Sequence, residues 1–294
     1  MSPSTTLETE NSNPAKLDYS KVTTLIFDID DTLYDVGTGF TAHRNGKGAT
    51  SFMVAKLNFK DEASAKLVRD EYFEKYHSTA KALTVAEDEG KIPLSPSSTS
   101  STTVATGRRM FDTKDLAQWW ATKLNFDLLG GPNPKLIDLL KSCPLNLIAF
   151  SNGPRLYVLR VLKELGLDTI FPPSKVFAVD DVLPYCKPEK ESFDIIMKKI
   201  GVNDPRECIM VEDSMKNIRA AKKLGMGTVL VAGIGRLRSN KGGSDHKINN
   251  EQSLADAAEA TKPGDAPDIS DNAVDHCIES VDELQSVLPF LWKN

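Results

Sequence analysis

Two carboxylates separated by one residue follow the first apolar run of the chain. Asp28 and Asp30 come directly after the run 22–27, within the sequence Asp-Ile-Asp-Asp-Thr. Carboxylates this close repel each other and raise one another's pKa unless a cation lies among them. Their hard oxygen atoms suit Mg²⁺, which also retains water ligands and binds phosphate. The pair therefore predicts a reaction assisted by a metal ion.

Three further polar segments occupy comparable places later in the chain. Ser151-Asn152 and Glu212-Asp213 each follow an apolar run, and Lys187 stands just before a helical segment. Taken singly, these segments are explained as a turn, a helix cap and a solvated lysine. Ligands of open α/β sheets bind outside the carboxyl ends of the strands. The segments together, in this order, therefore predict a single site.

The residue types at the predicted site suit the transfer of a phosphoryl group. Asp28 is the candidate nucleophile and Asp30 the candidate acid and base, because two carboxylates in different environments can divide these roles. Asp28, Asp30 and Asp213 are the candidate Mg²⁺ ligands. Lys187 and the metal would let a phosphate dianion approach an aspartate. The Ser151 hydroxyl and the N–H groups of its turn would hold phosphate oxygens.

Apolar, β-branched runs alternate with amphipathic segments along most of the chain. The predicted strands are 22–27, 145–150, 175–179, 207–211, 228–232 and 274–278. Helical spacing is found between 50 and 91 and after Thr113, and further predicted helices are 157–165, 189–200, 215–224 and 281–288. Gly166, Gly201 and Gly225 are predicted to end three of these helices.

This alternation predicts an α/β fold, in which a Rossmann-like, doubly wound parallel sheet carries an inserted helical domain. The predicted parts are a disordered segment 1–20, a core of 21–38 and 136–294, and a helical insertion 39–135. Within them, 95–101 is a predicted low-complexity loop, and 235–272 a mobile insertion with one candidate helix at 254–260.

Composition narrows the class of protein. The 294 residues carry 36 Lys and Arg against 41 Asp and Glu, a net charge of −5, which argues against a partner that is a nucleic-acid polymer. No apolar run reaches the roughly 18 residues of a membrane span, and the N-terminus has no hydrophobic block. The four cysteines are far apart in sequence, which predicts free thiols in a reducing compartment. We expect a cytoplasmic protein with a small-molecule substrate and no membrane partner.

The residues at the predicted site resemble the four motifs of the haloacid dehalogenase superfamily. The sequence at 28–32 is similar to its DxDx[TV] signature, and Ser151, Lys187 and Glu212-Asp213 match its second, third and fourth motifs. The helical insertion after the first motif is similar to a type-1 cap. Within the superfamily, the pyrimidine 5′-nucleotidase branch of fungi and plants has similar segments, which here are FDIDDTLY (27–34), YHSTAKAL (76–83), CKPEKESF (186–193), EDSMKNIRAAKKLGM (212–226) and VDHCIESVDELQSVLPFLW (274–292).

The resemblance implies a mechanism for phosphomonoester hydrolysis. Asp28 would form an aspartyl-phosphate, and Asp30 would protonate the leaving oxygen and then accept a proton from water. Mg²⁺ would be held by Asp28, the backbone carbonyl of Asp30, and Asp213, with Glu212 nearby. The substrate-binding residues would be Thr32, Ser151 and Asn152, the last through its N–H. Lys187 would offset charge and orient the nucleophile.

Substrate choice is expected to depend on the insertion and on the loop after the first motif. The candidate residues are Tyr34, His43, Arg44, Asn45, Lys47, Tyr76, Thr79, Lys81, Arg108, Trp119 and Trp120. Tyr72, Phe73 and Tyr76 are interpreted mainly as packing residues of the insertion. The leading hypothesis is a Mg²⁺-dependent nucleotidase for UMP or CMP. The alternatives are a phosphatase for a sugar phosphate, pyridoxal phosphate or FMN, and a catalytically idle protein that binds a phosphorylated ligand.

Overall fold

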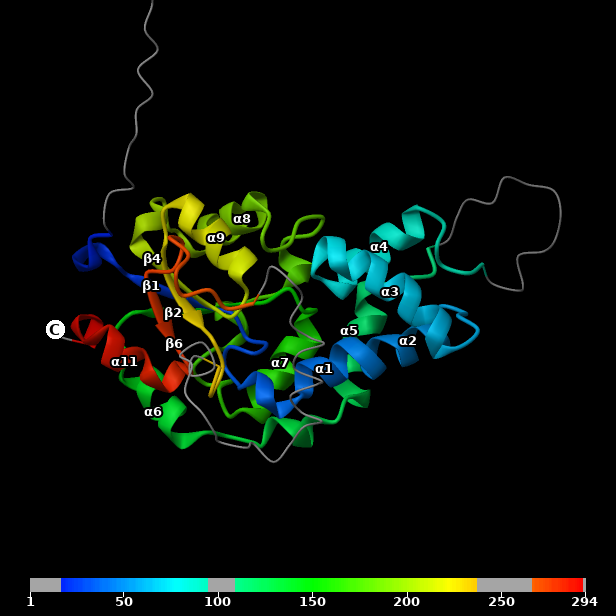
Figure 1. Ribbon diagram of the computed structural model, residues 1–294, viewed down its shortest axis with the longest axis horizontal. Coiled ribbons are helices and arrows are strands. Elements are labelled where there is room, and N and C mark those ends of the chain that lie inside the picture. The colour runs from blue at the N-terminus through cyan, green and yellow to red at the C-terminus, as the bar shows by residue number, and fades with distance from the viewer. Residues whose placement is uncertain (1–16, 95–108, 237–265, 293–294) are drawn as a thin grey trace, which may run out of the picture.

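Six parallel strands form one sheet in the order β3-β2-β1-β4-β5-β6 (Figure 1). The computed structural model describes residues 17–94, 109–236 and 266–292. The strands are β1 (Thr24–Phe27), β2 (Asn146–Phe150), β3 (Val176–Phe177), β4 (Cys208–Glu212), β5 (Gly227–Val231) and β6 (His276–Ile278). The predicted doubly wound parallel sheet is therefore confirmed.

Helices cover both faces of this sheet (Figure 1). The longer helices are α2 (Ala49–Lys56), α3 (Glu62–Tyr76), α4 (Thr79–Asp88), α5 (Thr113–Lys123), α6 (Pro134–Ser142), α7 (Arg155–Glu164), α8 (Lys190–Ile200) and α9 (Met215–Leu224). One-turn helices are α1 (Phe40–His43) and α11 (Leu284–Val287), and a π-helical turn spans Arg44–Gly48. Short 3-10 helices are Tyr19–Lys21, Val36–Thr38, Phe126–Leu129, Pro173–Lys175, Val179–Asp181, Pro205–Glu207, Val281–Glu283 and Pro289–Trp292.

Strand β1 shows why both faces need a cover. All four of its residues are buried, and successive side chains of a strand point to opposite faces. Ile26 packs in a cluster with Phe193 of α8. Phe27 belongs to a different cluster, which includes Leu162 of α7. A continuously apolar run is thus buried between two helical layers, as the sequence predicted.

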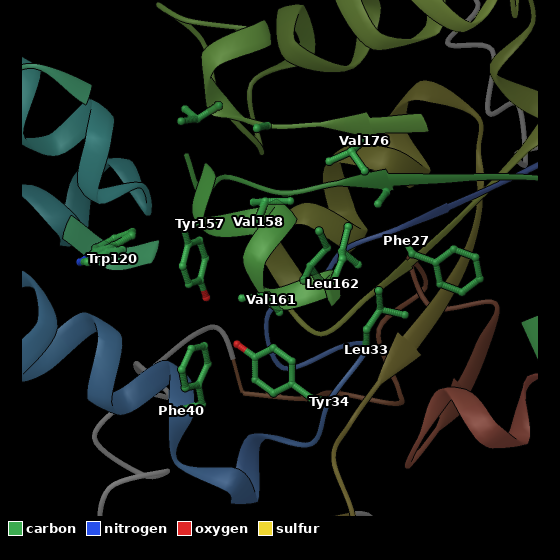
Figure 2. Close-up of a cluster of buried hydrophobic side chains, with 14 of the residues drawn as sticks. Phe27, Leu33, Tyr34, Phe40, Trp120, Tyr157, Val158, Val161, Leu162 and Val176 are labelled. Carbon is green, nitrogen blue, oxygen red and sulfur yellow. The ribbon is translucent and has the colours of Figure 1, made fainter. Parts of the chain in front are cut away.

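Helices α1 to α5 lie between β1 and β2 in the chain and form the helical insertion. They extend to one side of the sheet (Figure 1). The insertion shares a hydrophobic cluster with α7, because Trp120 makes an edge contact with Tyr157 at 5.3 Å between ring centroids and Phe40 stacks on the same ring at 6.3 Å. Figure 2 shows these three rings beside one another.

Several elements differ from the predicted ones in length. The strand expected at 175–179 has two strand residues, because 3-10 turns flank it on both sides. The helix expected at 281–288 begins as a 3-10 turn before α11. Helices α1 and α6 were not predicted. The candidate helix 254–260 and the loop 95–101 lie outside the described residues.

Two segments that the sequence predicts to be disordered or mobile contain described residues with definite contacts. Within the expected disordered segment 1–20, Tyr19 donates or accepts a hydrogen bond with His276 at 2.7 Å and packs on Phe290 with 4.6 Å between ring centroids. These contacts show that Tyr19 is ordered, contrary to the prediction for that residue. Within the expected mobile insertion 235–272, Asp271 pairs with Arg219 at 2.7 Å. Residues 237–265 of that insertion lie outside the described part.

Two predictions from composition concern membrane segments and thiols. In the described residues, none of the helices is both long and apolar enough to span a membrane. The four cysteines are free, with Cys186 and Cys208 buried and Cys143 and Cys277 half-buried. The prediction of free thiols is confirmed.

Candidate active site

The ammonium of Lys187 lies at the centre of an acidic cluster at the carboxyl end of the sheet. Its Nζ donates to Asp28 Oδ1 at 2.6 Å, to Glu212 Oε2 at 2.8 Å and to the carbonyl oxygen of Phe150 at 2.8 Å. The side chain is 1% exposed. Burial alone would lower the pKa of Lys187, but the charges of Asp28 and Glu212 outweigh it and raise the pKa. Lys187 is therefore a buried, charged lysine that joins β1, β2 and β4.

Three carboxylates at this position could hold a metal ion. Asp28, Glu212 and Asp213 each offer an oxygen, and these oxygens all lie within 4.8 Å of one another. Burial, followed by the charge of Glu212, raises the pKa of both Asp28 and Asp213 well above the usual value. A divalent cation would remove this penalty on the charged forms. Hard carboxylate oxygens also suit Mg²⁺, so the donor set fits that ion.

Asp30 is held by a set of hydrogen-bond donors. Its Oδ1 accepts from Tyr34 Oη at 2.8 Å and from Tyr157 Oη at 2.5 Å. Its Oδ2 pairs with Arg44 and accepts from Ser151 Oγ at 3.4 Å. Figure 2 shows the two tyrosine hydroxyls directed toward the same space. Burial raises the pKa of Asp30, but the Arg44 charge and the hydroxyl donors outweigh it, and the pKa is lowered.

Arg44 is held in the insertion by aromatic rings and by polar partners. Its guanidinium lies 5.4 Å from the ring centroid of Trp120 and 5.2 Å from that of Tyr157. Nη1 also donates to Tyr157 Oη at 3.0 Å, and Nε donates to Asn45 Oδ1 at 3.1 Å. The π-helical turn after α1 thus places this arginine beside Asp30.

The turn after β2 links three parts of the molecule. Ser151 Oγ accepts the Gly153 N–H at 2.9 Å. The Asn152 side chain bonds the backbone of Lys187 twice, since Oδ1 accepts its N–H at 2.9 Å and Nδ2 donates to its carbonyl at 2.8 Å. The Asn152 carbonyl in turn accepts from Ser78 Oγ in the insertion at 3.1 Å. The Asn152 side chain therefore positions the segment that carries Lys187.

Two other residues of the first motif have distinct environments. Thr32 donates to Asp213 Oδ1 at 3.4 Å, which places its hydroxyl against the carboxylate cluster. Asp31 has a left-handed backbone with φ of 60°, and its Oδ1 is buried without a hydrogen-bond partner among the described residues. Burial raises the pKa of Asp31 from 3.8 to about 7. Asp31 is thus a strained and poorly solvated carboxyl beside the two predicted catalytic ones.

A cavity of about 140 Å³ separates the acidic cluster from the insertion. Core residues on its wall include Asp28, Asp30, Asn152, Lys187, Glu212 and Asp213. Its opposite wall is formed by residues of the insertion, namely Thr41, Arg44, Asn45, Phe73, His77, Ser78, Thr79 and Trp120. The cavity therefore brings the predicted catalytic residues face to face with part of the predicted specificity set.

The structure separates the specificity candidates into two groups. Arg44, Asn45, Thr79 and Trp120 line the cavity, and Tyr34 contacts Asp30. The other described candidates are not on its wall. His43 accepts the Asn125 N–H at 3.2 Å, and Trp119 packs on Phe52. Lys81 pairs with Glu189 and lies over the Tyr76 ring, and Lys47 is part of the π-helical turn. Arg108 lies outside the described residues.

One contributor to the site, Tyr157, was not predicted. It lies on the first turn of α7, at a position whose apolar periodicity indicates only a core residue. Its ring is fully buried, and its hydroxyl group is the part of the side chain that contacts Asp30. Nothing in the local sequence distinguishes such a tyrosine from an ordinary packing residue.

A parallel sheet with acidic residues at its carboxyl end and a helical insertion after its first strand defines a Rossmann-like α/β protein with a site at the sheet edge. Residues 22–225 match the haloacid dehalogenase-like hydrolase family, and the chain belongs to that family.

Solved structures with low sequence identity are similar to this chain over most of its length. The L-2-haloacid dehalogenase from Xanthobacter autotrophicus, with chloropropionic acid covalently bound, is 19% identical with a TM-score of 0.51, over 91% of this chain and 98% of that one. A phosphonoacetaldehyde hydrolase-like protein from Oleispira antarctica is 16% identical with a TM-score of 0.51, over 93% and 94%. A HAD phosphatase from Thermococcus onnurineus is 20% identical with a TM-score of 0.48, over 91% and 98%.

Proposed function

We propose that the protein is a Mg²⁺-dependent phosphomonoester hydrolase that works through an aspartyl-phosphate. The observation that carries this proposal is the contact of Lys187 Nζ with Asp28 inside the three-carboxylate cluster. A lone cluster of carboxylates would repel a phosphate dianion. The Lys187 ammonium bound to Asp28, next to carboxylates that could hold a metal ion, lets the phosphate dianion approach.

Asp28 is the nucleophile in this proposal. Its Oδ1 is held by Lys187, and its carboxylate lines the cavity, so an in-line attack on phosphorus would start from a fixed position. Attack forms the bond from the Asp28 oxygen to phosphorus and breaks the ester bond. The Lys187 ammonium offsets the negative charge that gathers on the phosphoryl oxygens.

Asp30 is the acid and base. The Arg44 pair and the two tyrosine hydroxyls favour its carboxylate, the form that accepts a proton from the water that hydrolyses the aspartyl-phosphate. In the first half-reaction Asp30 gives a proton to the leaving oxygen, and the proton that it takes from the hydrolytic water restores this form for the next turnover.

Mg²⁺ would be held by Asp28, Asp213 and the Asp30 backbone carbonyl, with Glu212 adjacent. When bound, it supplies charge stabilisation for the phosphoryl oxygens. The Thr32 hydroxyl orients Asp213 for this role. The Ser151 hydroxyl and the Asn152 N–H are the proposed phosphate donors.

We further propose that residues 39–135 act as a cap that selects the leaving group, and that the substrates are pyrimidine nucleoside monophosphates such as UMP and CMP. The support is the resemblance of five segments to the pyrimidine 5′-nucleotidase branch, together with a cavity whose far wall comes from the insertion. Sugar phosphates, pyridoxal phosphate and FMN are the alternative substrates. An idle phospholigand-binding protein would have no use for a second carboxylate held like Asp30.

The test is phosphate release from a panel of these esters with Mg²⁺ or with EDTA. We expect release only with Mg²⁺, and Asp28→Asn should reduce it by about a thousandfold or more, since the covalent step is lost. Asp138→Asn, at an exposed position of α6, is the matched control and should retain activity. Full activity of Asp28→Asn would refute the nucleophile assignment.

A second arm of the test addresses the fold relative that binds chloropropionic acid. Incubation with 2-chloropropionate should release no chloride, because Asp30, on the same cavity wall as Asp28, is placed to protonate a leaving oxygen, a step that ester cleavage needs and halide displacement does not. Chloride release without phosphate release would overturn the phosphatase proposal.

A further inference from the structure

The insertion packs against both tyrosines that donate to Asp30. Phe40 of α1 contacts the Tyr34 ring edge-on at 5.8 Å and stacks on the Tyr157 ring at 6.3 Å, measured between ring centroids. Figure 2 shows the Phe40 ring beside both of them. All three rings are buried. Close packing therefore fixes the two phenol rings, and the rotation of each hydroxyl proton is the freedom that remains.

Each of these hydroxyls also has a polar partner in the insertion. Tyr34 Oη donates to Asp30 Oδ1 and lies 2.8 Å from Thr41 Oγ1. A phenol hydroxyl has one proton. Because that proton goes to Asp30, the Thr41 hydroxyl is the donor in its contact with Tyr34. Tyr157 Oη likewise donates to Asp30 Oδ1 at 2.5 Å and accepts from Arg44 Nη1 at 3.0 Å.

These contacts form two short chains of hydrogen bonds that end on the same carboxylate oxygen. One chain leads from Thr41 through Tyr34 to Asp30, and the other leads from Arg44 through Tyr157 to Asp30. A donor that occupies a hydroxyl oxygen turns the hydroxyl proton away from itself and strengthens the next hydrogen bond in the chain. Two residues of the insertion thus set the direction in which both tyrosines donate.

We propose that Thr41 and Arg44 are positioning residues for Asp30, and that they act by directing the hydroxyls of Tyr34 and Tyr157 toward its carboxylate. This inference rests on the proposed phosphomonoesterase activity and goes beyond it. It gives the insertion a role in proton transfer in addition to the choice of the leaving group.

Hydrolysis of the aspartyl-phosphate is the step that isolates this role. In that step the water oxygen bonds to phosphorus, a water proton passes to Asp30, and the bond from phosphorus to the Asp28 oxygen breaks. The first half-reaction can be made independent of Asp30 by choice of the ester. The leaving group of p-nitrophenyl phosphate departs as a stable anion and needs no proton, so its release reports only the attack by Asp28.

The test compares Thr41→Val with Thr84→Val, the same isosteric change at two positions of the insertion. The Thr84 hydroxyl donates to the Ala80 carbonyl at 2.9 Å, and Thr84 is not among the residues that line the cavity. The first phase of p-nitrophenol release measures formation of the aspartyl-phosphate. Acid quenching after a pulse of radiolabelled ester and a chase of unlabelled ester measures its decay.

We expect Thr41→Val to slow the decay about fivefold, the effect of one hydrogen bond, and to leave formation within about twofold of wild type. Arg44→Lys keeps a charge but loses the planar guanidinium that bonds two partners at once, so it should slow the decay at least as much. Thr84→Val should change neither rate. An unchanged decay in Thr41→Val or Arg44→Lys would overturn the proposal, as would an equal loss in formation and decay, which is the result of a general structural change.

Failure of the proposed function has a different signature, which is no p-nitrophenol release by the wild-type protein. A double-mutant cycle then still tests the chain of hydrogen bonds, because it needs no turnover. Urea unfolding compares Thr41→Val, Asp30→Asn and the double variant with wild type. Since Thr41 acts on Asp30 through Tyr34, the two changes in the free energy of unfolding should not add. Additive changes would overturn the proposal.

Discussion

Replacement of Asp31 by Asn should make the protein less sensitive to alkaline pH. The carboxyl of Asp31 is 8% exposed, and its Oδ1 has no partner among the described residues. Asn has nearly the same shape and, unlike most residues, tolerates the left-handed backbone found here, with φ of 60°. The substitution therefore removes the ionisation with little other change.

The expected magnitude follows from the pKa of Asp31, which burial raises from 3.8 to about 7. Because the folded state binds this proton more tightly than the unfolded state, the stabilisation is complete below pH 3.8 and is lost as pH rises through 7. The whole loss is about 4 kcal/mol, of which about 3 kcal/mol falls between pH 5 and 8. Asp31→Asn lacks this loss. Its free energy of unfolding should rise relative to wild type by about that amount over the same interval.

Urea unfolding at pH 5 and pH 8 in EDTA, followed by tryptophan fluorescence, measures this difference. Asp138→Asn is the control, because Asp138 is exposed on α6 and its substitution should leave the difference from wild type equal at both pH values. Parallel pH dependence for wild type and Asp31→Asn would show that the Asp31 carboxyl is solvated, and would refute the reasoning.

Three other predictions concern the same site. Lys187→Met leaves two buried carboxylates without their ammonium and should lower the free energy of unfolding at pH 7 by about 3–5 kcal/mol. A loss under 1 kcal/mol, measured by urea unfolding, would contradict this. Tyr157→Phe removes one donor to Asp30 but keeps the ring, so kcat for UMP should fall about tenfold with little change in KM. An unchanged kcat would show that the Tyr157 hydroxyl does not position Asp30. Mg²⁺ should raise Tm more at pH 8 than at pH 5. The reason is that metal binding requires ionised carboxylates, and the pKa of Asp213 is raised. Equal Tm shifts at the two pH values, measured by calorimetry, would contradict this.

The sheet could be predicted because its strands carry an unambiguous local signal. The run 22–27 is short, β-branched and apolar throughout, which only a strand buried on both faces satisfies. Helix α1 and the π-helical turn could not be predicted in this way. The segment Arg44–Gly48 contains two glycines and has weak intrinsic helix propensity, and burial of Phe40 and Arg44 against other parts of the fold stabilises it.

The same contrast applies to the site. Topology brings Asp28 and Lys187 together, since Asp28 follows the end of β1 and Lys187 precedes the start of α8 at one edge of the sheet, and the structure places them in contact. The donors to Asp30 depend on side-chain direction. Tyr157 lies 127 residues from Asp30, and only the packing of α7 against the insertion turns its hydroxyl toward that carboxylate. Sequence spacing contains no information about that rotation.

The bonds of Asn152 imply that the position of Lys187 depends little on the insertion. Its two shortest side-chain bonds hold the backbone of Lys187, and both partners belong to the sheet side of the molecule. Among the described residues of the insertion, Ser78 donates to the Asn152 carbonyl, and the His77 carbonyl accepts a long contact from Asn152 Nδ2 at 3.5 Å. Departure of the helices would break these weaker ties first. The backbone of Lys187 would then keep its place beside Asp28, whereas Asp30 would lose its pair with Arg44 of the insertion.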